Sequence, residues 1–120
     1  MENYPTSQGK TTIAPDVLLT IAQLTTLSVP GVNRLGHVPS IRITRFVKKG
    51  YTREGVQIAI IDDKVFTELY VILDSGANIR DVSRTIQNEV SRSITEMVGM
   101  QVGRVDVHIV DVEFPMEIKA

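Results

Sequence analysis

Two runs of alternating side chains, separated by a short polar turn, constrain the fold of this chain most. In residues 56–61 and 65–73 successive side chains fall on opposite faces, which is the period of two expected of β-strands. Asp62-Asp63-Lys64 lies between them, and Asp favours turns because its carboxylate hydrogen-bonds to nearby backbone groups. We therefore predict a β-hairpin and assign the two adjacent carboxylates to its turn rather than to a catalytic pair.

A second period indicates a long amphipathic helix after the hairpin. Asn78 is a good N-cap residue, Asp81 follows in the first turn, and Gly99 is suited to end the helix in a left-handed conformation. At 100° per residue, the apolar side chains fall within an arc of about 120°. The predicted buried face comprises Ile79, Val82, Ile86, Val90, Ile94 and Met97.

The other predicted helix precedes the strands and carries no charge after Asp16. Pro15 suits its first position, and Pro30-Gly31 stops it. We assign its packing face to one row of side chains: Val17, Ile21, Leu24 and Ser28, joined by Leu18 and Thr25.

Two leucines fall outside that packing face. Because Leu19 and Leu27 exceed what one packing face needs, they predict a protein interface together with Gln23. The alternative is a core helix that is buried on nearly all sides.

Further strands are predicted at residues 41–47 and at about 102–113, and 10–13 could form a short one. The order α-β-β-β-α-β predicts an α+β fold of two layers. Two amphipathic helices would cover one face of a mainly antiparallel sheet of four to five strands, since this buries every apolar stripe. We expect a flexible tail over 1–9, one domain over 10–114 and a C-terminal tail over 115–120.

Composition narrows the classes of function. The net charge of the 120 residues is −1, so nucleic acid or anionic lipid would need a local patch. With no cysteine, disulfides, thiolate nucleophiles and thiolate zinc sites are excluded. The longest uncharged stretch, 17–33, is interrupted by polar residues, so we expect no direct membrane insertion. No nucleotide-binding glycine motif is present, and we predict no cofactor and no metal.

Histidine chemistry offers one hypothesis. Asp106 and His108 would share a face of the last strand, where a carboxylate could orient an imidazole for acid–base catalysis. The simpler interpretation is a pair of polar residues on the less buried face, which we favour because nothing signals a nucleophile or third partner. His37 lies in a predicted loop. We therefore predict no catalytic residues and no enzyme.

One segment concentrates positive charge. Phe46 and Tyr51 lie among its basic side chains, so the segment could contact phosphates and stack bases. The alternative, which we favour, is an edge strand that Lys and Arg protect from aggregation. The candidate anion or nucleic-acid contacts are Arg42, Arg45, Lys48, Lys49 and Arg53, preceded by Arg34.

Several segments, taken in order, resemble the bacterial alkaline shock protein family. They are GKTTIAPDVL (9–18), VPGV (29–32), GVQIAI (55–60), VSRTIQNEV (82–90) and VDVHI (105–109). Ser75-Gly76 replaces a usual Tyr-Gly, and Asp106 replaces a usual Asn. These departures leave the subfamily open.

The resemblance implies a non-enzymatic, cytoplasmic scaffold or binding protein linked to the cell envelope stress response. It also implies self-association into a homo-oligomer. The implied partners are a membrane-anchoring protein, through which the chain would associate with the membrane, or a component of acetyl-CoA carboxylase.

Overall fold

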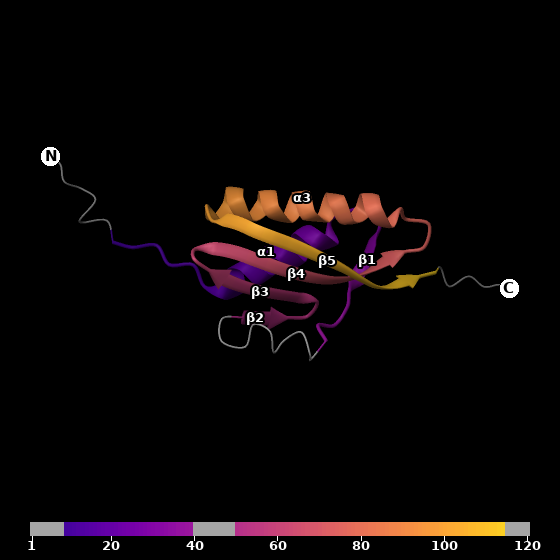
Figure 1. Ribbon diagram of the computed structural model, residues 1–120, viewed down its shortest axis with the longest axis horizontal. Helices are drawn as coiled ribbons and strands as arrows, with labels where there is room; N and C mark the ends of the chain where they lie inside the picture. The colour runs from indigo at the N-terminus through magenta and orange to yellow at the C-terminus, as the bar shows by residue number, and fades with distance from the viewer. Residues whose placement is uncertain (1–8, 40–49, 115–120) are drawn as a thin grey trace.

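The computed structural model describes residues 9–39 and 50–114, which form two helices and five strands (Figure 1). The predicted α+β architecture is confirmed, because α1 and α3 pack against one face of the sheet. In chain order the elements are α1 (Pro15–Leu27), β1 (Val32–Leu35), β2 (Gly50–Arg53), β3 (Val56–Ile61), β4 (Lys64–Asp74), α3 (Ile79–Val98) and β5 (Gln101–Glu113).

Strand β4 is the centre of the sheet. Along one edge it pairs antiparallel with β3 over residues 64–69 and with β1 over residues 71–73. Along its other edge it pairs parallel with β5, and β2 extends the sheet beyond β3. The sheet is therefore mainly antiparallel, as predicted, and α3 makes the crossover that the parallel pair requires.

The ends of β1 and β3 meet at Tyr70. Its backbone N–H donates to the Gly55 carbonyl at 2.9 Å, and its carbonyl accepts from the Gly36 N–H at 2.7 Å. Both glycines are needed at this junction. A Cβ on Gly36 would lie 2.7 Å from Val110 Cγ2, and one on Gly55 would lie 2.6 Å from the Leu35 Cβ.

The predicted β3–β4 hairpin is present, but its turn is one residue shorter than predicted, because Lys64 already belongs to β4. Asp62 and Asp63 form a two-residue turn between the paired residues Ile61 and Lys64. Their φ angles are 52° and 63°, which matches a type I′ turn, where both central residues have positive φ. Asp tolerates this conformation because its short side chain can hydrogen-bond locally. The adjacent carboxylates are thus part of the turn.

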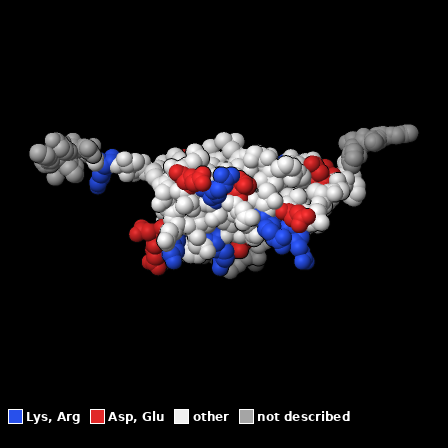
Figure 2. Space-filling model, turned by 90° about the horizontal axis from the view of Figure 1, so that it is seen from above, with Lys and Arg blue, Asp and Glu red and all other residues white. Residues whose placement is uncertain are grey.

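Helix α3 confirms the predicted amphipathic pattern. The Asn78 side chain accepts a hydrogen bond from the Asp81 N–H at 3.0 Å, and Gly99 ends the helix with φ 80°. The buried residues are Val82, Ile86, Val90 and Ile94, whereas Ile79 and Met97 at the two ends are exposed. Seen from above, charged side chains of both signs lie over α3 (Figure 2).

Helix α1 is rotated relative to our prediction. Its buried residues are Leu18, Leu19, Ile21, Ala22 and Thr26. Ala22 and Thr26 are fully buried. Their small side chains let the helix approach its neighbours closely. The prediction weighed only large apolar residues, so it placed Val17 and Leu24 in the core, and both are exposed.

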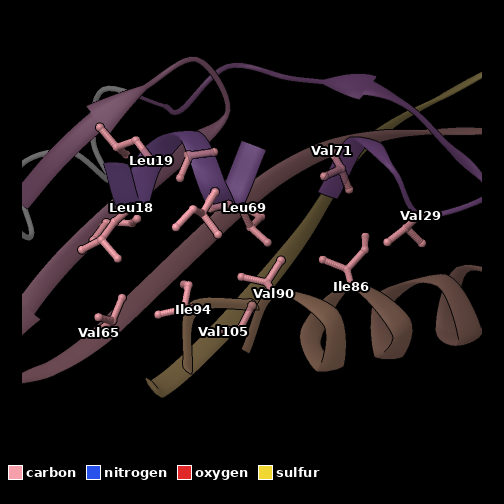
Figure 3. Close-up of a cluster of buried hydrophobic side chains, with 14 of the residues drawn as sticks. Leu18, Leu19, Val29, Val65, Leu69, Val71, Ile86, Val90, Ile94 and Val105 are labelled. Carbon is pink, nitrogen blue, oxygen red and sulfur yellow. The ribbon is translucent and has the colours of Figure 1, made fainter. Parts of the chain in front are cut away.

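The hydrophobic core lies between the helices and the sheet (Figure 3). Alternate β4 side chains, including Val65, Leu69 and Val71, face Leu18 of α1 and Ile86 of α3. Burying each such side chain contributes about 1.5–3 kcal/mol of transfer free energy.

Other predictions about the strands were wrong or fall outside the described residues. Residues 10–13 form no strand, and the predicted polar connection 48–55 contains β2. The short strand β1 was not predicted. The expected strand at 41–47 and nearly all of both expected tails lie outside the residues described here.

Candidate protein interface on helix α1

The outer side of α1 exposes apolar side chains that the core does not use. Leu24 is 63% exposed, Val17 45% and Leu27 44%. Met97, near the end of α3, is 71% exposed. Within α1 the only charged side chain is that of Asp16, in the first turn. A nearly uncharged apolar surface of this kind on a folded domain typically marks a binding face.

This surface is a ridge between two grooves. One groove, of about 430 Å³, is lined by Met97 of α3 and by Asp16, Val17, Thr20, Ile21, Leu24 and Thr25 of α1. The other, of about 260 Å³, is lined by Gln23, Leu24 and Leu27 of α1 and by Arg34, Leu35 and Glu54. Leu24 borders both grooves and so forms the ridge. We call this surface the α1 face.

Arg53 of β2 fixes the position of α1. Its Nη1 donates to Thr20 Oγ1 at 2.7 Å and to Gln23 Oε1 at 3.3 Å, and its Nη2 lies 3.3 Å from Asp16 Oδ1. Gln23 Nε2 donates to the Glu54 carbonyl at 3.1 Å. The side of α1 toward β2 is therefore held by polar contacts.

The three predicted interface residues occupy different places. Leu27 is exposed on the α1 face, and Gln23 is half-buried and lines the second groove. The assignment of Leu19 was wrong: it is only 3% exposed and belongs to the core. Sequence reasoning missed Val17, Leu24 and Met97, although the lack of charge along α1 did indicate an interface on this helix.

The predicted basic patch lies mostly outside the residues that the structure describes, so it stays a prediction. Arg42, Arg45, Lys48 and Lys49 lie outside them, and Arg53 is directed toward α1. Arg34 pairs with Glu113 at 2.9 Å. In the view of Figure 2, Lys and Arg are interspersed with Asp and Glu rather than gathered into one field.

His108 does not pair with Asp106, the residue that the disfavoured acid–base hypothesis placed beside it. Its Nε2 lies 3.1 Å from Glu68 Oε1, whereas Asp106 pairs with Arg104 at 3.0 Å. The buried Glu68 also accepts a hydrogen bond from the Tyr70 hydroxyl at 2.8 Å, and the Tyr70 and His108 rings stack at 4.6 Å. This cluster joins β4 to β5 on the face away from the helices, and only the parallel register reveals it.

Other chemistry is sparse in the described part of the chain. No group of three or more His, Asp or Glu residues there could hold a metal ion, and His37 is exposed. No described helix is long and apolar enough to cross a membrane. On α3 the hydrogen bond and charge of Glu89 raise the pKa of Arg92, which simply keeps an exposed ion pair charged.

Comparison with solved structures shows the same fold elsewhere. MamM-CTD 215-293 superposes with a TM-score of 0.50 at 10% identity, covering 85% of this chain and all of that one. A MamM CTD triple variant gives a TM-score of 0.51 at 10% identity and covers 82% of this chain and 96% of its own. At this identity the likeness concerns the fold alone.

Sequence relatives come from two bacteria. YqhY of Bacillus subtilis (strain 168) is 27% identical over 115 residues, which cover 95% of this chain and 84% of that protein. Spy1535 of Streptococcus pyogenes serotype M6 is 28% identical over 102 residues, covering 84% and 77% respectively. Residues 3–114 match the model of the alkaline shock protein 23 family, described by its cell envelope-related function. The chain therefore belongs to this family, as its segments indicated.

Proposed function

We propose that this chain is a non-enzymatic scaffold or binding protein of the cell envelope, and that it acts through protein–protein contacts made by the α1 face. One observation carries the proposal: α1 exposes Leu24, Val17 and Leu27 although its core side is already complete. Folding alone does not require these apolar side chains outside, and covering them would release water from apolar surface.

The chemistry of the α1 face favours a protein over other partners. α1 itself contains no Lys or Arg, whereas helices that lie on membranes carry basic residues on their polar side. Nucleic acid would likewise require cations aimed at phosphates. Large aliphatic side chains around a groove are typical of helix-in-groove protein recognition.

The non-enzymatic part of the proposal is supported by how the polar cluster is used. Glu68 Oε1 accepts from Tyr70 and lies beside His108, and these contacts link two neighbouring strands. Hydrogen-bond partners on both strands account for a carboxylate buried at this place in the sheet.

The family assignment supports the choice of partners. We propose a membrane-anchoring protein or an acetyl-CoA carboxylase component, with self-association through the same surface. The chain would then be cytoplasmic and would reach the membrane through its partner.

A charge placed on the ridge tests this proposal. We expect Leu24→Glu to reduce co-purification of the anchoring protein or carboxylase component from native cells by at least about ten-fold, since a central interface residue contributes about 2 kcal/mol or more. Quantitative mass spectrometry of tagged chains measures it. Asn88→Glu is the matched control, because it adds the same charge at an exposed site on α3. Equal retention by both variants would refute the proposal.

A further inference from the structure

We infer that Met97 is a site of reversible oxidation, at which conversion of its thioether to a sulfoxide weakens partner binding by the α1 face. This inference rests on the proposed function and names a regulation of the same surface. It is carried by the exposure of Met97, by its place in the larger groove and by the chemistry of sulfur.

Met97 lies where an oxidant reaches it easily. It is 71% exposed, whereas Met100 is half-buried and packs against the core. The chain has four methionines and no cysteine, so thioethers are its only oxidisable sulfur groups. The other two methionines, Met1 and Met116, lie outside the described residues. Because an oxidant must touch the sulfur, Met97 should react faster than Met100.

Folding does not require an apolar side chain at position 97. The two residues before it, Thr95 and Glu96, are exposed and polar, as expected on the outer side of an amphipathic helix. Met97 is the α3 residue that lines the groove of about 430 Å³, and the other lining residues come from α1. The thioether therefore forms the α3 wall of a groove that we assign to partner binding.

The reaction is a two-electron oxygen transfer from hydrogen peroxide. The sulfur lone pair attacks one peroxide oxygen, so that an S–O bond forms and the O–O bond breaks. The departing hydroxide takes up the remaining peroxide proton as water. The sulfur is thus oxidised and the peroxide reduced. A methionine sulfoxide reductase reverses the change, since two thiols supply the electrons, become a disulfide and release the oxygen as water.

Oxidation makes the α3 wall of the groove polar. The thioether suits the apolar lining provided by Val17, Ile21 and Leu24, whereas the sulfoxide oxygen is a hydrogen-bond acceptor that needs a donor. Water provides one in the free protein. A partner that covers the groove with apolar side chains would displace this water and offer no donor in return. An acceptor buried in this way should lower the affinity by about ten-fold.

Peptide mass spectrometry of the purified full chain during exposure to hydrogen peroxide tests the site. We expect Met97 to be oxidised at least about five-fold faster than Met100, because it is the more exposed of the two. Circular dichroism should stay unchanged, since the Met97 side chain is not part of the core. Equal rates at the two methionines would overturn the assignment of Met97.

Two substitutions at position 97 test the effect on binding. Met97→Leu keeps a similar apolar volume without an oxidisable sulfur, and Met97→Gln introduces a polar amide without any oxidant. Met100→Leu is the matched control, because it removes the neighbouring sulfur and leaves Met97 in place. Each tagged chain, untreated or oxidised and then freed of peroxide, is mixed with a desalted lysate of native cells. Quantitative mass spectrometry measures the retained anchoring protein or carboxylase component.

We expect oxidised wild type, oxidised Met100→Leu and untreated Met97→Gln each to retain about ten-fold less partner than untreated wild type. Oxidised Met97→Leu should retain as much as the same variant untreated. Equal losses from oxidised Met97→Leu and oxidised wild type would place the sensitive group elsewhere and overturn the inference.

The variant Leu24→Glu separates this inference from the proposed function. If Leu24→Glu lost the partner but oxidised wild type retained it fully, the proposed function would stand and the inference would fall. If neither Leu24→Glu nor oxidation reduced retention, both would fall.

Discussion

The two helices of this protein differ in the side chains on their outer sides. On α3 the core takes Val82, Ile86, Val90 and Ile94, and charged side chains such as Arg92 and Glu89 form pairs on the outer side. On α1 the core takes a broad arc that includes the small residues Ala22 and Thr26, and the outer side is still largely apolar.

The difference teaches where to look for function. The residue pattern of α3 is explained by burial on one side and water on the other. This division does not explain the residue pattern of α1, because Leu24 and Leu27 remain exposed although neither contributes to the buried core. Apolar residues that folding does not require are the clearest sign of a binding surface here.

The largest expected effect is the difference in stability between a charge on the buried side of α1 and the same charge on its exposed side. Leu19→Glu places a carboxylate at a site that is 3% exposed, so it should cost at least about 4 kcal/mol of unfolding free energy and leave little folded protein. Leu24→Glu, on the α1 face, should change the stability of the monomer by less than about 0.5 kcal/mol. Urea denaturation at a concentration that keeps the chain monomeric compares them. Similar losses would show that both leucines belong to the core.

A smaller difference in stability is expected between variants that remove the ion pairs of the two helices. Arg53→Ala removes the contacts that hold α1 to β2, and we expect a loss of about 1–2 kcal/mol, since a part-buried side-chain hydrogen bond contributes about 1 kcal/mol. Arg92→Ala removes only exposed pairs within α3, so its melting temperature should match the wild type. If Arg92→Ala destabilised the protein as much as Arg53→Ala, the contacts of Arg53 with α1 would contribute no more to stability than an exposed ion pair.

The smallest effect concerns the helix starts. Asn78 caps α3 with its side chain, whereas Ala14 precedes α1 in an extended conformation and offers no side-chain cap. Asn78→Ala should cost about 1 kcal/mol, and Ala14→Ser should stabilise the protein by about 0.5 kcal/mol. Thermal unfolding of both variants measures the contrast. A destabilising Ala14→Ser would mean that this position does not act as an N-cap.

Local patterns predicted α3 and the β3–β4 hairpin well. The cap at Asn78 and the turn at Asp62-Asp63 are determined within a few residues, so sequence alone suffices. The rotation of α1 could not be predicted, because α3 and the sheet both cover the helix and together bury the small residue Ala22. When the buried arc is wide, large side chains no longer mark its centre.

Predicting the candidate site from the sequence would have required contacts between residues even farther apart along the chain. Leu24 becomes a ridge only because Met97 and Leu35, distant in sequence, border the grooves beside it. The pairing of His108 with Glu68 likewise follows from the parallel register of β4 and β5. The uncharged run along α1 indicated an interface, but only the packed helix distinguishes Leu27, which is exposed, from Leu19, which is not.

The junction at Tyr70 has a consequence for how the sheet finds its alignment. Two strands lie end to end along one edge of β4, and only this residue separates the positions they occupy. A shift of β3 by one residue toward β1 would drive Gly55 into Leu35 and would also turn every side chain of β3 to the opposite face. Each strand thus acts as a stop for the other, and sliding errors that an isolated hairpin could tolerate are blocked by its neighbour.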